Sequence, residues 1–368
     1  MLRIKTLQLQ QFKNYHSAVM QLSGQVNCFV GRNGAGKTNV LDAVYYLSFT
    51  KSYFNAVDAQ NVKHGTDFFS VQAKYDRNNL DEEALLVLYR GKKTLKLNNN
   101  EVKKFSEHIG QYPLVIITPN DIMLLHEGSE ERRRFIDGII SQVDKVYLSN
   151  LLLYNRTVEQ RNKQLRLFAE GNYYDNDLLE SYNQLLDKHG TPLFVKREAF
   201  LKHYIPIVNG FYRLISEQQE EVDIIYQSDL LLNGFTQLLE QSALNDRSAQ
   251  RTTKGVHKDE LEFTINGFPL KKMGSQGQQK SFIIALKLAQ YEYLKQQTTV
   301  KPLLLLDDIF EKLDEHRLKA LLLMIANDDF GQILITDTHY ERVQQVFSTI
   351  NQVEVKYFMV DNGTINEI

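Results

Sequence analysis

The feature that most constrains this chain is a glycine-rich loop near its N-terminus. Residues 31–38 read GRNGAGKT and match the pattern G-x-x-x-x-G-K-[ST] of a phosphate-binding loop. The apolar run Val26–Val30 precedes the loop, and an amphipathic helix pattern follows it. This order of strand, loop and helix directs backbone N–H groups and a helix N-terminus at a polyphosphate. The sequence therefore predicts a nucleotide site formed by Gly31, Arg32, Asn33, Gly34, Ala35, Gly36, Lys37, Thr38 and Asn39.

Four side chains carry the predicted phosphate and metal chemistry. Lys37 is expected to contact the β- and γ-phosphates, and the hydroxyl of Thr38 is expected to bind Mg²⁺. Far along the chain, the apolar run Leu303–Leu306 ends in two carboxylates, Asp307 and Asp308. At the carboxyl edge of a parallel sheet, Asp307 would hold Mg²⁺ through water. Asp308 would then orient or deprotonate the attacking water.

A third candidate element is Gly274–Gln279, which reads GSQGQQ directly before a helix pattern at 278–296. Its residues Ser275, Gly277 and Gln278 form an anion site of the kind found at helix N-termini. An ordinary helix cap, with Ser275 as the capping residue and no ligand, explains the same pattern. Both interpretations stay open at this point.

Composition narrows the class of protein. The 368 residues carry a net charge of −2, which excludes a wholly basic nucleic-acid binder and an acidic disordered chain. A single cysteine, Cys28, excludes an intramolecular disulfide framework and a multi-cysteine zinc site. The longest apolar run, Ala320–Ala326, is far shorter than the roughly 20 residues of a membrane helix. We therefore expect a reduced, cytoplasmic protein without a membrane span.

Hydrophobic patterns divide the chain into an α/β domain and an inserted helical lobe. The α/β domain is expected to be discontinuous, with residues 1–121 and 246–368, and the helical lobe to comprise residues 122–245. The insertion is poor in glycine and rich in Leu, Gln, Glu, Lys and Arg, which favours long helices. Strand patterns are expected at 7–9, 26–30, 68–75, 84–90, 93–97, 115–117, 261–265, 303–306, 333–335 and 353–360.

Further segments join these motifs along the chain: Phe12–Tyr15, Thr118–Asp121, Gly128–Ser129, Arg132–Phe135, Gly255–Leu261, Gly274–Gln279 and Leu305–Asp314. The order of the motifs is that of ATP-binding-cassette ATPases, and through these segments the chain resembles the RecF family of SMC-like recombination mediators nearly end to end. Two departures are Val256, in place of a usual proline, and Asp337, where cassette proteins often have a histidine that senses the γ-phosphate. The second departure leaves open which residue contacts the γ-phosphate.

The resemblance implies an α/β fold, an SMC-like ATP-binding-cassette head with an inserted helical lobe and no long coiled coil. ATP and Mg²⁺ would lie between two heads, so that Ser275, Gly277 and Gln278 of one copy meet the nucleotide of the other. Lys37, Asp308 and Ser275 are then the candidate catalytic residues of a weak DNA-dependent ATPase. Its turnover would act as a switch rather than as a motor.

The family also implies a biological role. The ATP-bound homodimer would hold single-stranded DNA and gapped or junction duplex DNA during repair of single-strand gaps, replication restart and the SOS response. RecR and RecO would be its partners in loading the strand-exchange protein. An alternative is an SMC-type scaffold in which ATP joins two subunits and hydrolysis is incidental. A transporter subunit is disfavoured, because the insertion is too polar to contact membrane spans.

Local charge and isolated reactive residues complete the predictions. Three basic windows, Arg90–Lys104, Arg156–Arg166 and Arg247–Lys258, could contact DNA phosphates, although such runs are more often solvated surfaces. The cluster Arg132–Arg134 could equally pair with the acidic residues beside it. We expect His257 and Cys28 to be structural, with no metal other than Mg²⁺.

Overall fold

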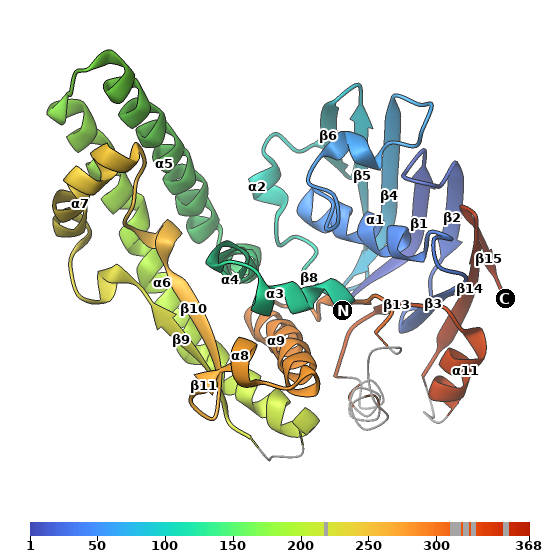
Figure 1. Cartoon of the computed structure of the whole chain (residues 1–368). Coiled ribbons are helices and arrows are strands. Elements are labelled where there is room, and N and C mark those ends of the chain that lie inside the picture. Colours follow the sequence, from blue (N-terminus) through green and yellow to red (C-terminus); the bar gives the residue numbers. More distant parts are fainter. Residues whose placement is uncertain (217–219, 310–317, 319–323, 325–328, 349–352) are drawn as a thin grey trace. The chain divides into compact units, whose positions relative to one another are not determined.

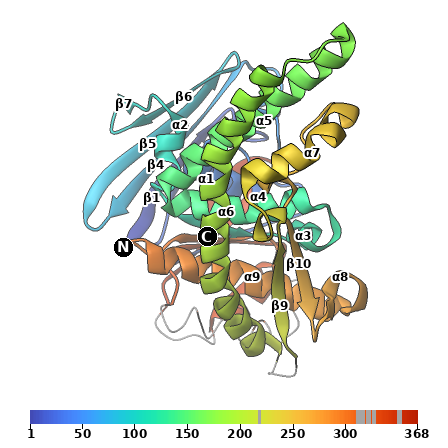
Figure 2. The ribbon, with the colours of Figure 1, turned by 90° about the vertical axis from the view of Figure 1, so that its left-hand side faces the viewer.

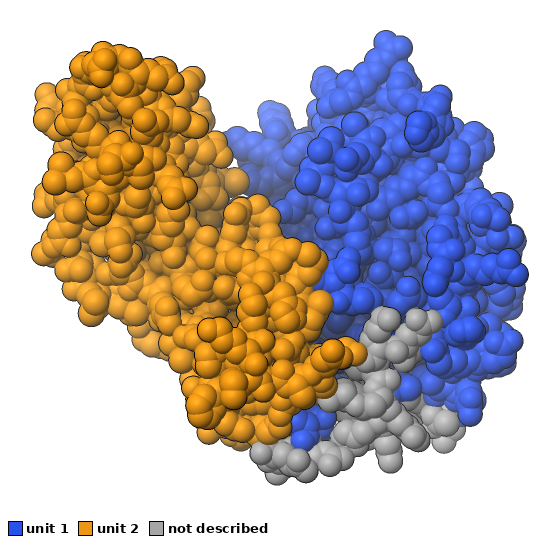
Figure 3. Space-filling model, in the orientation of Figure 1, with its two compact units in different colours: residues 1–121, 214–216, 284–368 blue, residues 122–213, 217–283 orange. Residues whose placement is uncertain are grey.

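The computed structural model describes residues 1–216, 220–309, 318, 324, 329–348 and 353–368. The chain divides into two compact units, shown in different colours in Figure 3. Unit 1 comprises residues 1–121, 214–216 and 284–368, and unit 2 comprises residues 122–213 and 217–283. Both α6 (Asn176–Ser216) and α9 (Gln276–Gln297) contribute residues to each unit. The head and lobe boundaries expected at 121/122 and 245/246 stay a prediction.

The first sheet of unit 1 is antiparallel, in the strand order β2-β1-β4-β5-β6-β7. Its inward-facing side chains alternate with exposed ones along β1, as a half-buried strand requires. The bounds are β1 (Leu2–Gln10), β2 (Ser17–Gln21), β4 (Phe68–Arg77), β5 (Leu80–Tyr89), β6 (Lys92–Leu97) and β7 (Asn100–Glu101). The strands expected at 7–9, 68–75, 84–90 and 93–97 are confirmed.

The second sheet of unit 1 contains the predicted buried strands, in the order β15-β14-β3-β13-β12-β8. All its pairs are parallel except that of β14 with β15. Its central strands are mostly apolar and are buried along their whole length, as expected for a sheet covered on both faces. The bounds are β3 (Val26–Val30), β8 (Leu114–Ile117), β12 (Leu303–Leu306), β13 (Ile333–Asp337), β14 (Val355–Asp361) and β15 (Thr364–Glu367).

Helix α1 (Lys37–Phe49) lies between the two sheets, and Figure 1 shows it beside β4 and β5. Its apolar side chains join one core with side chains from both sheets, for example Val44 with Phe69 and Leu305. The described residues of unit 1 also include much of α9 and the short helices η1 (Asp58–Asn61), α2 (Phe105–His108) and α11 (Tyr340–Ser348). This packing fixes the N-terminus of α1 at the carboxyl edge of the parallel sheet.

Unit 2 is built on an antiparallel pair of long helices, α5 (Lys145–Gly171) and α6, which lie side by side in Figure 2. It also holds a small sheet in the order β11-β10-β9. The bounds of its other elements are η2 (Pro119–Ile122, which begins in unit 1), α3 (Met123–His126), α4 (Ser129–Val143), β9 (Val222–Gln227), η3 (Asp229–Leu231), α7 (Phe235–Ala249), η4 (Val256–Lys258), β10 (Glu260–Ile265), β11 (Phe268–Pro269) and α8 (Leu270–Met273).

The strand β9 lies in a stretch for which the sequence predicts helices only. Val222 and Ile224 are buried while Asp223 and Ile225 face outward, which is a strand alternation. This pattern covers six residues within a segment whose composition favours helices, so composition outweighed it in the prediction. Strand β10 is confirmed, and Asn266 and Gly267 form the predicted turn after it, both with positive φ.

Candidate nucleotide-binding site

The phosphate loop connects β3 to α1, and two of its glycines allow no side chain. Gly31 and Gly36 have φ values of +156° and +116°. A Cβ at Gly31 would come closer than 3.0 Å to the carbonyl oxygen of Val360, and one at Gly36 would overlap the side chain of Asn14. These contacts explain why the loop needs glycine at both positions, since the loop backbone packs directly on neighbouring segments.

Lys37 lies inside the loop. Its side chain is buried, and Nζ donates hydrogen bonds to the carbonyl oxygens of Gly31 at 2.8 Å and Arg32 at 3.2 Å. The ammonium group is therefore held by the backbone that is expected to surround the phosphates. This position is the one that a phosphate-binding lysine needs, because the charge is in place before the anion arrives.

The two halves of the predicted metal site meet directly. The hydroxyl of Thr38 donates a hydrogen bond to Oδ1 of Asp307 at 2.8 Å, although 268 residues separate the two in the sequence. Burial raises the pKa of Asp307, while hydrogen bonds from Thr336 and Thr38 and the charge of Lys37 act in the opposite direction. A hydroxyl and a carboxylate oxygen are ligands that Mg²⁺ prefers, so the residues fit this ion.

Thr336 is a site residue that the sequence analysis missed. Its hydroxyl donates to Oδ1 of Asp307 at 2.8 Å and accepts from the backbone N–H of Asp308 at 2.9 Å. Asp308 has a φ of +44°, so its backbone turns sharply directly after β12. Thr336 therefore holds both carboxylate residues in place, although it belongs to β13. The signal was its position near the carboxyl end of a strand that pairs in parallel with β12.

The segment Phe12–Tyr15, quoted above only for its family resemblance, supports the phosphate loop. The amide of Asn14 donates to the carbonyl oxygen of Ala35 at 2.7 Å, and the hydroxyl of Tyr15 donates to that of Gly36 at 2.8 Å. Next to them, Lys13 forms an ion pair of 2.5 Å with the fully buried Asp42 of α1. The segment thus fixes the backbone of the loop and the helix that follows it.

Asp337, whose role as a γ-phosphate sensor was left open, is already engaged. It is buried and accepts two hydrogen bonds from Nη2 of Arg342, at 2.6 and 2.7 Å. It also accepts one from the backbone N–H of His339 at 2.7 Å. His339 is exposed and lines an open pocket of about 740 Å³, within the size range of ligand pockets. The other walls of this pocket are residues 30–33, Ala35, 338, 340–341 and 359–362.

The third predicted element lies in unit 2, at the N-terminus of α9. Oγ of Ser275 accepts from the backbone N–H of Gln278 at 3.2 Å, and Oε1 of Gln278 accepts from the N–H of Ser275 at 2.6 Å. These reciprocal bonds form a capping box, so Ser275 is the cap residue of α9. Nε2 of Gln278 also contacts Glu220. Contact of Ser275, Gly277 or Gln278 with a nucleotide stays a prediction, and the predicted motif residues 311–314 lie outside the described residues.

Several other residues singled out by the sequence are structural. Cys28 is buried in β3, and burial raises the pKa of its thiol. His257 is held by the hydroxyl of Tyr154 at 2.8 Å and the carbonyl oxygen of Thr252 at 3.1 Å, and burial lowers its pKa to about 4. Arg134 pairs with the acidic residues beside it, Glu130 and Glu131.

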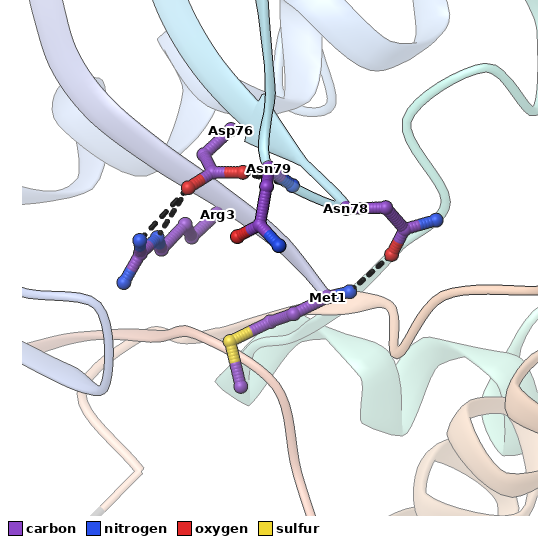
Figure 4. Close-up of a pocket in the computed structure, with 5 residues that line it drawn as sticks. All are labelled: Met1, Arg3, Asp76, Asn78 and Asn79. Carbon is purple, nitrogen blue, oxygen red and sulfur yellow. Dashed lines mark hydrogen bonds and ion pairs between the residues drawn. The ribbon is translucent and has the colours of Figure 1, made fainter.

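A further pocket of about 380 Å³, shown in Figure 4, lies where β1 meets the β4–β5 turn. Arg3 donates two hydrogen bonds to Oδ2 of Asp76, and these bonds hold the pKa of Asp76 below its usual value. The N-terminal amine of Met1 contacts Asn78, and Asn79 donates its N–H to Asp76 at 2.9 Å. The charged groups of this pocket thus satisfy one another. Among the described residues, none of the helices is long and apolar enough to cross a membrane.

Fold and site together define an SMC-like ATP-binding-cassette ATPase head, and known proteins support this class. A family model described as RecF/RecN/SMC N terminal domain matches residues 3–366. The Smc head domain of Pyrococcus furiosus superposes with a TM-score of 0.59 at 16% identity, covering 100% of this chain and 96% of the other, which shows the fold alone. The predicted fold class is confirmed, and no long coiled coil extends from the described residues.

Closer relatives identify the family. The DNA replication and repair protein RecF of Flavobacterium johnsoniae is 46% identical over 95% of this chain and 98% of its own length. The RecF protein of Bacteroides thetaiotaomicron is 42% identical over 99% of this chain and 98% of its own length. A solved structure of the recombination mediator protein RecF-ATP in the RecFOR pathway superposes with a TM-score of 0.90 at 28% identity, over 100% of this chain and 98% of the other. The chain belongs to the RecF family of DNA replication and repair proteins.

Proposed function

We propose that this chain binds ATP with Mg²⁺ and hydrolyses it slowly in response to DNA. The observation that carries the proposal is the 2.8 Å contact between Thr38 and Asp307, which joins the phosphate loop to the carboxylate strand. Lys37 would bind the β- and γ-phosphates, and Thr38 and Asp307 would hold the metal. When bound, Mg²⁺ neutralises charge that develops on the phosphate oxygens.

Asp308 is the proposed residue that orients the attacking water. Thr336 fixes the backbone N–H of Asp308, and this contact limits how far its carboxylate can move. Asp337 is a poor candidate for direct contact with the γ-phosphate, since its carboxylate is buried and neutralised by Arg342. Slow turnover suits a switch, in which the bound nucleotide sets the state and hydrolysis ends it.

A second copy of the chain would complete the nucleotide-binding site. Ser275, Gly277 and Gln278 begin α9, and a helix N-terminus attracts phosphate. Ser275 is exposed, so it is available to a partner. A ligand at a hundred times its Kd stabilises the state that binds it by ~2.7 kcal/mol, and two shared sites would roughly double this. ATP would therefore convert a weak dimer into a stable one.

The proposed role of the dimer is an ATP-dependent clamp on single-stranded and gapped DNA, in the repair of gaps and in replication restart. It would act in the cytoplasm with RecO-type and RecR-type partners to load the strand-exchange protein. Near full-length similarity to RecF proteins supports this role. The head would comprise residues 1–121 and 246–368, and the helical lobe residues 122–245.

Light scattering with and without ATP and gapped DNA tests the proposal. We expect ATP to raise the molar mass about twofold, as a symmetric dimer requires. Ser275→Arg should prevent this rise, because a bulky cation replaces the exposed cap residue. A monomeric ATP-bound wild type would contradict the proposal.

The variant Asp308→Asn distinguishes this clamp from the alternative, a scaffold in which hydrolysis is incidental. This variant should remain dimeric on DNA after the wild type has released it. Equal release rates for the two proteins would favour the scaffold. Nucleotide binding itself should be unaffected, since Asp308 is not a proposed phosphate or metal ligand.

A further inference from the structure

The segment between α7 and β10 in unit 2 forms a closed loop with two cations at its ends. We call residues 251–258 the basic loop. The ring of His257 contacts the carbonyl oxygen of Thr252 at 3.1 Å, which brings the two ends of the loop together. Arg251 and Lys258, the residues next to this pair, are both exposed. The hydroxyl of Tyr154 on α5 lies 2.8 Å from Nδ1 of His257, so α5 supports the loop.

Two aspartates that flank the basic loop are turned inward and neutralised. Asp246 pairs with Arg161 at 2.7 Å, and both side chains are almost fully buried. Asp259 pairs with Arg197 at 2.9 Å, and both side chains are equally buried. Because two buried arginines take up these carboxylates, neither aspartate presents its charge at the surface.

A third cation approaches the loop from α4. Nη1 of Arg133 donates to the backbone carbonyl oxygen of Asp259 at 2.5 Å, directly beside Lys258. Burial lowers the pKa of Lys258, and the positive charges of Arg251 and Arg133 lower it further, while Asp246 and Glu130 act in the opposite direction. Among the ion pairs of the described residues, none involves Arg133, Arg251 or Lys258. We call these three residues the basic cluster.

Other cations of the same window differ from the basic cluster. Lys254 forms an ion pair of 2.9 Å with Asp229. The guanidinium of Arg247 lies 4.6 Å from the ring centre of Tyr174. The structure thus separates the window 247–258, which looked uniform in sequence, into two cations held by side-chain contacts and two, Arg251 and Lys258, that form none of the ion pairs among the described residues.

We propose that the basic cluster binds backbone phosphates of duplex DNA; this rests on the proposed function and names the surface in unit 2 that carries it. The two cations of the loop and Arg133 of α4 repel one another, and an anion relieves this repulsion. Arginine can bind a phosphate through two parallel hydrogen bonds, and such contacts need no base sequence. The buried pairs hold the loop in place, so little ordering is needed when DNA binds.

The test measures the binding of labelled duplex DNA by fluorescence anisotropy, at several salt concentrations and with ATP present. It compares the wild type with the double variant Arg251→Gln/Lys258→Gln. Each phosphate contact contributes about 0.9 to the slope of log Kobs against log salt. We therefore expect the slope to fall by about 1.8, with unchanged ATP affinity and unchanged Tm. The charge-keeping variant Arg251→Lys/Lys258→Arg should retain the wild-type slope.

The matched control is Arg247→Gln/Lys254→Gln, which removes the same charge from the same window. We expect it to keep the wild-type slope within about 0.5, because both cations are already engaged. Equal slopes for both double variants, whether lowered or unchanged, would overturn the inference while leaving DNA binding by the wild type intact. A wild type that does not bind DNA would instead contradict the proposed function.

Discussion

The hydroxyl of Thr336 bridges Asp307 and Asp308, and Thr336→Val tests what this bridge contributes to stability and to metal binding. Valine has nearly the same shape as threonine, so the change leaves no cavity and removes only the hydroxyl. Two interactions are lost: the bond to Asp307 at 2.8 Å and the acceptor for the N–H of Asp308 at 2.9 Å. Thr336 is fully buried, so water cannot replace either one.

The size of the effect follows from these two losses. A hydrogen bond to a charged group contributes about 1.5–3 kcal/mol, and an unsatisfied buried donor costs about 1–3 kcal/mol. We expect Thr336→Val to lower the free energy of unfolding by at least about 2.5 kcal/mol. For units of this size each kcal/mol changes Tm by roughly 2–4 °C, so Tm should fall by about 5–10 °C.

Thermal unfolding followed by circular dichroism, together with Mg²⁺ titration of ATP binding, measures both consequences. Loss of the Thr336 hydrogen bond raises the pKa of Asp307 further and should weaken metal-dependent ATP binding. The control is Thr94→Val on β6, an identical chemical change at a partly exposed position, which should change stability by less than about 0.5 kcal/mol. If Thr336→Val behaves like Thr94→Val in both assays, the bridge has no energetic role.

Three further outcomes follow from the structure. Gly31→Ala should abolish ATP binding, because its Cβ would overlap Val360, whereas Gly65→Ala, with open space around it, should retain ATP binding in the same calorimetric titration. Arg197→Met should cost about 3–5 kcal/mol in urea unfolding, since it leaves Asp137 and Asp259 unpaired inside unit 2, against less than about 1 kcal/mol for the exposed Arg134→Met. Burial raises the pKa of Asp307 in the folded state. Without metal, the stabilisation that this group contributes is therefore complete at pH values below the pKa of an ordinary aspartate, and it is lost as the pH rises through the folded-state pKa. The Tm gain from Mg²⁺ with ATP should therefore grow as pH rises through this window, and a gain that does not change with pH would contradict this reasoning.

Local motifs were predictable from the sequence because each one is short and has a fixed physical context. The phosphate loop needs glycines at set positions between a strand and a helix, and all of these lie within one segment. The pair Asp307 and Asp308 was recognisable because an apolar strand ends there. Their expected proximity to Thr38 followed from a general rule of parallel sheets, and the structure brings Thr38 and Asp307 into contact.

The contacts that the sequence did not predict depend on strand order. Thr336 could be assigned to the site only once β13 was known to lie between β3 and β12. The roles of Asn14 and Tyr15 depend on which backbone carbonyl oxygens of the loop face them, which no spacing rule encodes. The basic window 247–258 could not be resolved either, because the partners of Arg247 and Lys254 come from distant segments.

The order of the parallel sheet has a consequence for how the protein is made. Strand β3, which leads into the phosphate loop, pairs with β13 and β14, and both are synthesised about 300 residues after it. Val360 of β14 lies against Gly31, and Gly363, just after β14, lies against Asn14. The early antiparallel sheet can pair as it emerges, but the nucleotide site closes only after β13 and β14 have been synthesised. A nascent chain should therefore be unable to bind ATP before β14 has emerged.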